Sequence, residues 1–369
     1  MHNSEDSYLE SYVTKFNGET PTPVIDVDVV EKNLIRAQAY MDSHGIQMRP
    51  HIKTHKSIIL AKRQIELGAV GITCQKLGEA EVMVDAGIAD ILVSFPIVGS
   101  LKIARLMALA RRAFMSVAVD SEEVAAAISK AAHEHKVDLS LLVECDTGGE
   151  RCGVQSPDAA AQLALKITKM PSVLFKGIMT YPPKGQVENT AAFLSQAISA
   201  MRALGVEPKV ISVGGTPDMY RAHELRLTEQ GVIHEHRPGT YLFSDRYMVH
   251  NNVGGINECA LRILATVVSR PTSNRAIIDA GSKTFSSDLM GFSDYGIILE
   301  YPDARIEKLS EEHGHVDVSA CNKKPIIGEI LTIIPNHACA VTNLSDCFLT
   351  TSSEHFSNSI NVDARGKVT

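Results

Sequence analysis

The densest group of reactive side chains is the run Arg49-Pro50-His51-Ile52-Lys53-Thr54-His55-Lys56, which holds two lysines and two histidines in eight residues. A lysine that is shielded from bulk water and close to other cations has a lowered amine pKa, and its neutral amine can attack an aldehyde. The run is therefore a candidate for covalent chemistry. The alternative interpretation is a basic loop exposed to solvent.

A second motif, Gly214-Gly215-Thr216-Pro217, has the composition of an anion-binding turn. Its two glycines allow close approach of the backbone, Thr216 can cap a helix, and Pro217 suits a first helical position. Backbone N–H groups at such a helix start can hold a phosphate without a basic side chain. The alternative is an ordinary strand-to-helix turn.

Arg151 and Tyr181 each follow an apolar run and could meet a ligand. Arg151 lies in the glycine-flanked segment 146–153, where its guanidinium could bind an anionic oxygen or, alternatively, form a surface ion pair. The Tyr181 phenol could hydrogen-bond to a ligand or belong to the core. His234 and His236 alternate along another run, and we interpret them as packed histidines rather than a metal-binding pair.

His337 and Cys339 follow an apolar run that ends at Pro335. Residues i and i+2 of an extended chain project to the same side, so these two side chains could bind one cation. Imidazole and thiolate are a ligand set that suits zinc, and two protein ligands leave positions open for substrate and water. The alternative is a buried free cysteine beside a histidine.

Between about residues 46 and 238, eight short apolar runs alternate with Ala- and Leu-rich amphipathic stretches, several of which begin with Ser or Thr and end in Gly. This count predicts a (β/α)8 barrel of the TIM type, whose reactive groups gather at the carboxyl ends of the strands. An open doubly wound sheet is the alternative, but no G-x-G-x-x-G motif follows any strand. The predicted strands lie at 46–51, 69–75, 90–95, 114–120, 139–146, 174–181, 209–215 and 232–238.

Beyond about residue 250, short alternating runs are separated by Gly, Pro, Asn and Asp, and no convincing helix is visible. This pattern predicts an all-β domain. We therefore expect an N-terminal segment at 1–19, a barrel domain at 20–248 and a β domain at 249–369 that carries the candidate metal ligands.

The composition excludes several classes of protein. Hydrophobic residues make up 44% and charged residues 21%, which is typical of a globular chain. The net charge of −7 and the lack of a basic stretch argue against a nucleic-acid partner or an anionic membrane. The chain has neither an apolar run of membrane-spanning length nor the apolar segment of a signal peptide. Its seven scattered cysteines argue against a disulfide framework, and we expect a cytoplasmic location.

Taken in order, these motifs resemble those of the D-serine dehydratase/D-threonine aldolase family, the fold-type III pyridoxal-phosphate (PLP) enzymes related to alanine racemase. The resemblance covers nearly the whole chain, and its most specific parts are R-P-H-x-K-T-H-K at 49–56 and N-H-x-C at 336–339. It implies a Schiff base between Lys53 and PLP. It implies that the backbone of Gly214, Gly215 and Thr216 binds the phosphate, and that Arg151 and Tyr181 lie near PLP. It further implies that His337 and Cys339 bind zinc (or manganese).

The resemblance also implies a homodimeric lyase acting on a small D-amino acid. We expect a dehydratase that converts D-serine, or a related 3-hydroxy-D-amino acid such as D-threonine or D-3-hydroxyaspartate, to a keto acid and ammonia. The aldolase branch typically has Asp at the position of Cys339, so an aldolase that releases glycine and an aldehyde is the alternative. A catalytically silent PLP-binding protein is a third, against which the metal pair counts. One departure from the family is Ala340, where relatives often have Pro.

Overall fold

The computed structural model describes residues 18–352 and 356–369, so most of the expected segment 1–19 lies outside the described residues. The chain forms two compact units. The barrel unit comprises 35–53, 58–239 and 367–369, and the sheet unit comprises the described residues within 18–34, 54–57 and 240–366.

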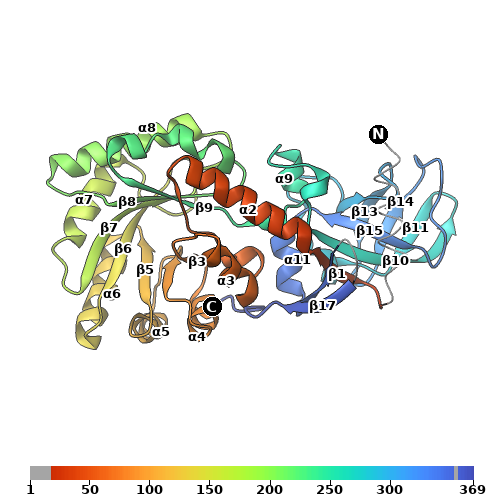
Figure 1. Cartoon of the computed structure of the whole chain (residues 1–369), viewed down its shortest axis with the longest axis horizontal. Helices are drawn as coiled ribbons and strands as arrows, with labels where there is room; N and C mark the ends of the chain where they lie inside the picture. The colour runs from red at the N-terminus through yellow and green to blue at the C-terminus, as the bar shows by residue number, and fades with distance from the viewer. Residues whose placement is uncertain (1–17, 353–355) are drawn as a thin grey trace. The chain divides into compact units, whose positions relative to one another are not determined.

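The barrel unit contains eight parallel strands, which confirms the predicted architecture (Figure 1). Each predicted run overlaps one of them, because β-branched residues bounded by turn residues favour strands. An isolated parallel bridge between His51 and Thr73 joins the chain beyond the first strand to the strand at the other end of the sheet. In sheet order the strands are β2 (Gln47–Met48), β9 (Ile233–Arg237), β8 (Val210–Gly214), β7 (Val173–Thr180), β6 (Leu139–Cys145), β5 (Phe114–Val119), β4 (Asp90–Val93) and β3 (Ile72–Cys74).

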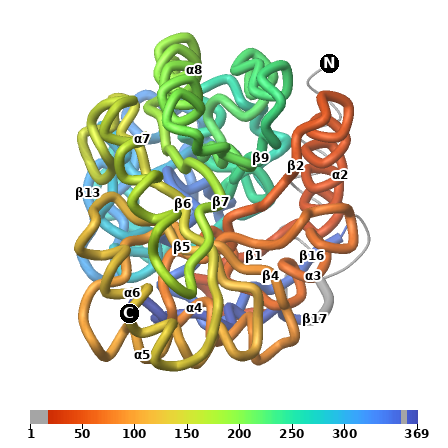
Figure 2. The backbone as a smooth tube through the Cα atoms, turned by 90° about the vertical axis from the view of Figure 1, so that its left-hand side faces the viewer, coloured from red at the N-terminus to blue at the C-terminus, as the bar shows by residue number. Residues whose placement is uncertain are grey.

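Amphipathic helices alternate with these strands, and Figure 2 shows α5 to α8 on the outside of the strands. Helix α7 illustrates why they form: the Ser156 hydroxyl caps its first turn by accepting from the Ala159 N–H (3.1 Å), and Pro157 occupies the first turn. Alanine and leucine then cover its buried face. The helices are α2 (Val27–Ser43), α3 (Ile58–Glu66), α4 (Leu77–Asp85), α5 (Ser100–Ala110), α6 (Glu122–His135), α7 (Pro157–Ile167) and α8 (Val187–Ala203).

The strands of the barrel are buried on both faces. Successive residues of a strand point to opposite faces, and one set packs with the helices in a large apolar cluster. The other set includes a small separate cluster of Leu92, Ala118, Leu142 and Met179, one from each of β4 to β7, which fills part of the barrel interior. This two-sided burial explains why the predicted strands are continuous apolar runs rather than alternating ones.

The sheet unit has a nine-stranded sheet in which β1 pairs in parallel with β16 and the other pairs are antiparallel. Strand β1 therefore belongs to this sheet, whereas the expected division placed residues 20–248 in the barrel domain. The strands are β1 (Thr22–Asp26), β10 (Leu261–Thr272), β11 (Arg275–Ile278), β12 (Gly296–Ile298), β13 (Arg305–Leu309), β14 (Gly314–Asp317), β15 (Ile330–Pro335), β16 (Cys347–Thr351) and β17 (Phe356–Asn361).

Among its described residues, the sheet unit also has the short helices α9 (Arg246–His250), α10 (Ser282–Phe285) and α11 (Ala338–Leu344). The expectation of no helix beyond residue 250 was wrong for α10 and α11, because segments of four and seven residues are too short to show a helical period. Among the described residues, no helix is long and apolar enough to cross a membrane. The seven cysteines are all free, as expected.

Candidate functional site

The basic run at 49–56 is largely buried, so the alternative of a solvent-exposed loop is wrong. Arg49 is 3% exposed and forms ion pairs with Glu235 (2.6 Å) and Asp90 (2.7 Å). The His51 ring contacts the side-chain oxygen of Gln75 at 3.0 Å. Lys53 is half-buried in a short 3-10 helix (η1, Ile52–Thr54) beyond the carboxyl end of β2. Lys53 is thus the one residue of the run that is not fully buried.

A pocket of about 250 Å³ lies at the carboxyl ends of β6 and β7 and brings two predicted residues together. The guanidinium carbon of Arg151 lies 5.0 Å from the centre of the Tyr181 ring, a cation–π distance. Tyr181 is 44% exposed, so it is not a core tyrosine. The pocket is lined by Glu144, Cys145, Asp146, Gly148, Gly149, Arg151, Cys152, Tyr181 and Pro183.

The glycine motif lies against this tyrosine. A Cβ atom on Gly214 would come within 2.8 Å of Tyr181 Cδ2 and 2.9 Å of Arg237 Nη2, so any side chain there must displace one of these groups. Gly215 has a φ of +110°, which also favours glycine. The motif therefore forms a side-chain-free surface at the carboxyl end of β8, beside Tyr181.

The predicted helix start at this motif was wrong. The Thr216 hydroxyl accepts a hydrogen bond from the Gly239 N–H (3.1 Å) and does not cap a helix. A 3-10 helix (η2, Met219–Leu225) begins two residues beyond Pro217, with Asp218 at its N-cap position. A sequence pattern cannot show whether the Thr216 hydroxyl caps a helix or binds elsewhere, since the hydrogen bond that it accepts comes from Gly239, which is distant in sequence.

Two buried charged residues of this region, Glu144 and Arg237, were not singled out by the sequence. Arg237 donates to the Ser212 hydroxyl (2.7 Å) and to the Thr180 carbonyl (2.9 Å), and burial lowers its pKa to about 10. Glu144 Oε1 lies 3.9 Å from Arg151 Nη2. Its other oxygen is buried without a hydrogen-bond partner among the described residues.

Burial raises the pKa of Glu144, and the positive charges of Arg151 and Arg237 oppose that shift. The signal that could have identified Glu144 is a single carboxylate inside an otherwise apolar strand, since such groups are costly to bury without a function.

His234 and His236 pack inside the barrel unit, as we interpreted them. Both are 2% exposed, and their ring centres are 5.9 Å apart in an edge-on arrangement. Burial lowers the pKa of His234 to about 3 and that of His236 to about 4, so both rings stay neutral. His236 Nε2 makes a 2.9 Å hydrogen bond with the Gly215 carbonyl, which ties it to the glycine motif.

In the sheet unit, His337 and Cys339 do come together, but not through an extended chain as predicted. His337 has extended backbone angles at the N-cap position of α11, and Cys339 lies in the first helical turn. Burial opposes the charge on His337, but Cys339 and Asp245 raise its pKa to about 11, which reflects how close both groups are to the ring. Helix α11, rather than alternation along a strand, therefore brings the His337 and Cys339 side chains together.

Asp245 fixes the orientation of His337. Its side chain is fully buried, and Oδ2 accepts from His337 Nδ1 (3.1 Å) and from the Ala338 N–H (3.0 Å). Oδ1 accepts from the Met248 N–H (2.9 Å) at the start of α9. With Nδ1 engaged in this way, Nε2 is the ring nitrogen that is left for a metal.

The surroundings of Cys339 include the hydroxyl of Thr54, the residue that follows Lys53 in the chain. Thr54 Oγ1 lies 3.2 Å from Cys339 Sγ, and the Thr240 hydroxyl lies 3.9 Å from it. Nearby, the Lys56 ammonium donates to the side-chain oxygen of Asn343 (2.9 Å), so the second lysine of the basic run binds a residue of α11. The run thus supplies residues to the sheet unit immediately after Lys53.

The donor set fits an open metal site rather than a closed structural one. In the described part of the chain, no three or more His, Cys, Asp or Glu side chains are arranged to hold a metal. His337 and Cys339 would supply two ligands, and the buried Asp245 makes the outer hydrogen bond that metal-binding histidines usually have. Such a site needs substrate or water to complete it.

The pocket beside Arg151 fits PLP on similar grounds. Gly214 offers a surface that any Cβ would fill, and Glu144 Oε2 is a buried acceptor without a partner among the described residues. Arg151 supplies a positive charge close to Glu144 and to the Tyr181 ring. Glycine backbone and a nearby cation are what an aromatic phosphate ester requires.

Comparison with known proteins settles the family. Residues 25–246 match the alanine racemase N-terminal domain, and residues 260–351 match the putative serine dehydratase domain. This chain belongs to the D-serine dehydratase/D-threonine aldolase family. Its members are PLP-dependent lyases, which confirms the predicted class of enzyme and the alanine racemase-like fold.

Members with different activities are similarly close to this lyase. The 3-hydroxy-D-aspartate aldolase of Paracoccus denitrificans (strain Pd 1222) is 32% identical, covering 95% of this chain and 92% of that protein. The D-threo-3-hydroxyaspartate dehydratase of Delftia sp. (strain HT23) is also 32% identical, covering 87% and 91%. The crystal structure of the D-threonine aldolase of Filomicrobium marinum matches with a TM-score of 0.86 and 32% identity, covering 95% and 97%.

Two variants of a D-threo-3-hydroxyaspartate dehydratase also match in structure. One carries a cysteine-to-alanine substitution and is in the metal-free form, with 30% identity, a TM-score of 0.84, and 94% and 97% coverage. The other carries a histidine-to-alanine substitution two positions earlier, with 27% identity and the same TM-score.

Proposed function

We propose that this lyase is a PLP- and zinc-dependent dehydratase of 3-hydroxy-D-amino acids, which releases a keto acid and ammonia. The observation that carries the proposal is the arrangement of His337 and Cys339 at the start of α11, with Asp245 orienting the imidazole. A racemase needs no metal at the substrate β-carbon, so this pair would have no purpose in one.

The barrel unit supplies the residues that we propose for cofactor binding. Lys53 would link to PLP, the backbone from Gly214 to Thr216 would hold the phosphate, and Arg151 and Tyr181 would lie near the ring. When bound, PLP withdraws electrons from the substrate α-carbon. The Lys53 amine, shielded by the buried run around it, is the group that we propose to remove the proton from that carbon.

The sheet unit supplies the residues that we propose for the metal. His337 Nε2 and Cys339 Sγ would hold zinc, or manganese in some preparations, as a Lewis acid for the substrate β-hydroxyl. Asp245 would keep the His337 ring in the orientation that exposes Nε2, and Thr54 would orient the Cys339 sulfur. Removal of the α-proton together with loss of the β-hydroxyl distinguishes a dehydratase from an aldolase, which breaks the bond between the α- and β-carbons.

The dehydratase variants support this choice. The histidine and cysteine replaced in them are two positions apart, as His337 and Cys339 are, and the cysteine variant is in the metal-free form. The aldolase remains the second candidate, because aldolases are among the relatives at 32% identity or more. Both an aldolase and a dehydratase relative are named for 3-hydroxyaspartate, so this substrate is the first to test.

A product assay tests the proposal. Purified enzyme is incubated with D-3-hydroxyaspartate, D-serine and D-threonine, each with and without a chelator, and ammonia, keto acid, glycine and aldehyde are measured. We expect a keto acid and ammonia in equal amounts, and loss of both in chelator. Glycine with an aldehyde and no ammonia would instead establish the aldolase. We also propose that the active form is a homodimer in the cytoplasm, which light scattering and cell fractionation test.

A further inference from the structure

A second, larger pocket lies in the barrel unit at the amino-terminal ends of the strands, the opposite ends from those that carry the PLP-site residues. It has a volume of about 640 Å³ and is framed by the starts of β4, β5, β6 and β7 and by the segment 110–113. This end of a (β/α)8 barrel usually serves stability rather than catalysis, so a pocket there requires an explanation of its own.

A β-bulge directs a lysine into this pocket. Leu141 of β6 is opposite Phe175 of β7, but Leu142 is opposite Gly177, so Lys176 is an extra residue in the ladder. Bulges are rare between parallel strands. A bulge changes the direction in which the side chain of the extra residue points. Gly177 makes this one possible, since a Cβ there would lie 1.8 Å from the Val210 carbonyl oxygen.

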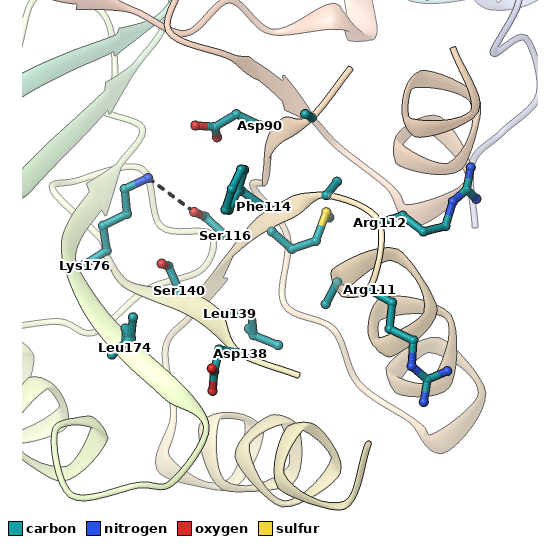
Figure 3. A pocket seen from close by; sticks show the side chains of 14 residues that line it. Asp90, Arg111, Arg112, Phe114, Ser116, Asp138, Leu139, Ser140, Leu174 and Lys176 are labelled. Atoms are coloured by element: carbon teal, nitrogen blue, oxygen red, sulfur yellow. Dashed lines mark hydrogen bonds between the residues drawn. The ribbon is translucent and has the colours of Figure 1, made fainter. Parts of the chain in front are cut away.

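Charges of opposite sign face the same part of the pocket. Figure 3 shows the Lys176 ammonium and the Asp90 carboxylate pointing to the same side, with Phe114 and Ser116 beside them. The Lys176 ammonium reaches the Ser116 hydroxyl only at 3.4 Å. Asp90 uses Oδ1 for Arg49, its side chain is 39% exposed, and no ion pair joins it to Lys176 in the described part of the chain.

The other cations at the pocket are engaged elsewhere. Arg112 forms an ion pair with Asp85 (2.7 Å), and Arg111 contacts the His135 ring (3.1 Å). Both point away from the Lys176 side in Figure 3. Lys176 is therefore the cation that a ligand in this part of the pocket would meet.

Neutralising the barrel interior does not account for Lys176. The positive charge of Lys176 helps to lower the pKa of the buried Glu235, but the two oxygens of that carboxylate are already bonded to Arg49 (2.6 Å) and to the Ser212 hydroxyl (2.6 Å). A third cation is not needed to stabilise a carboxylate that has both oxygens satisfied. Lys176 thus acts on Glu235 only through its charge, and among the described residues its ammonium forms no ion pair and only the long hydrogen bond to Ser116.

Apolar side chains form the rim of the pocket. Phe114, the first residue of β5, is 78% exposed, and Leu174, near the start of β7, is 65% exposed. Large apolar side chains that are exposed beside a concave surface indicate a ligand site more often than single exposed apolar residues scattered over the surface do.

We propose that this pocket is a second, non-catalytic site that binds a free α-amino acid with an apolar side chain. The ligand carboxylate would pair with Lys176 and accept from Ser116, its ammonium would pair with Asp90, and its side chain would pack on Phe114 and Leu174. The enzyme's proposed substrates carry a polar 3-hydroxyl, so the two sites differ in the ligand that they select. The site is independent of the reaction assigned above, because none of its residues lines the PLP pocket.

Calorimetric titration of the PLP-loaded enzyme with L-leucine tests the proposal. Two analogues separate the charges: 4-methylpentanoate lacks the ammonium, and 3-methylbutylamine lacks the carboxylate. We expect leucine to bind with a Kd on the order of 1 mM. We expect each analogue to bind at least about tenfold more weakly, since each leaves one pocket charge without a partner.

Two variants and one control locate the binding. Lys176→Met should weaken leucine binding at least about tenfold, whereas Lys166→Met, at an exposed ion pair with Glu122, should change it less than about twofold. Leu174→Glu adds a negative charge at an exposed position and should abolish binding even if Lys176→Met fails to fold. Absence of leucine binding to the unaltered enzyme up to roughly 50 mM would overturn the proposal. Binding by Lys176→Met and Leu174→Glu that is as tight as that of the unaltered enzyme would overturn it too.

Discussion

Asp245 Oδ2 accepts a hydrogen bond from His337 Nδ1 at 3.1 Å, across 92 residues of sequence. The same oxygen binds the first N–H of α11, so one buried carboxylate positions both the imidazole and the helix that carries Cys339. The proposed metal ligands of the sheet unit are therefore held by a residue outside their own motif.

Asp245→Asn should weaken metal binding by about 10- to 100-fold. The asparagine amide can present its NH₂ group to His337 Nδ1, which favours the tautomer with a proton on Nε2, the ligand nitrogen. Competition with a coloured zinc chelator measures the affinity without reference to activity. Asp288→Asn, at an exposed carboxylate of the same unit, is the control. Unchanged zinc affinity in Asp245→Asn would mean that the hydrogen bond has no role in binding.

Lys53→Ala should abolish covalent attachment of PLP. The visible absorbance band of lysine-linked PLP, at roughly 410–420 nm, should disappear, and activity should fall by about three orders of magnitude or more. Borohydride reduction and peptide mapping should find pyridoxyl on Lys53 in the unaltered enzyme. Lys62→Ala, at an exposed lysine of α3, should keep the band. Persistence of the band in Lys53→Ala would refute the assignment.

Gly214→Ala should lower the affinity for PLP by about tenfold or more, because the added methyl must displace the Tyr181 ring or the Arg237 guanidinium from close contact. Equilibrium titration of the apoenzyme with PLP measures the effect. Gly254→Ala is the control, since its Cβ would meet only the flexible Glu258 side chain. Equal PLP affinity in the two variants would show that the turn is not part of the cofactor site.

The buried His234 should make the enzyme less stable in acid. Its folded pKa of about 3 lies below the unfolded value near 6.5, so only the unfolded chain takes up a proton as the pH falls from about 6.5 towards 3. Stability contributed by the neutral ring is present above pH 6.5 and is lost on acidification. Between pH 7 and pH 5.5 this one group should cost about 1 kcal/mol of unfolding free energy.

Urea unfolding at the two pH values checks this expectation. His234→Leu should reduce the loss of stability between them by about 1 kcal/mol, whereas His133→Leu, at an exposed ring on α6, should leave it unchanged. The same acid sensitivity in both variants would contradict the buried, neutral state of His234.

The sequence predicts most of the barrel because its strands are buried on both faces. β-branched runs such as the one that contains β6 are bounded by turn residues and repeat at regular intervals, so their number and order are visible without a structure. The division between units was harder to predict, since β1 pairs with β10 and β16, which lie more than 200 residues further along the chain.

The candidate site was predictable where its residues form local motifs and not where contacts are distant. Lys53, Gly214 and Cys339 lie in short, recognisable runs. Asp245 lies outside every motif, and its role depends on a contact with His337 that only the fold creates. Helix α11 is too short to leave a helical period, so alternation along an extended chain gave the right pair for the wrong reason.

The most direct test of the central claim measures ammonia and glycine in the same reaction of the enzyme with D-3-hydroxyaspartate. The reaction is run with zinc, with chelator, with zinc restored after chelator, and with Cys339→Ala. A metal-dependent dehydratase predicts ammonia and a keto acid in equal amounts with zinc, loss of both in chelator and in Cys339→Ala, and recovery when zinc is restored. Glycine without ammonia, or full ammonia release in chelator, would contradict it.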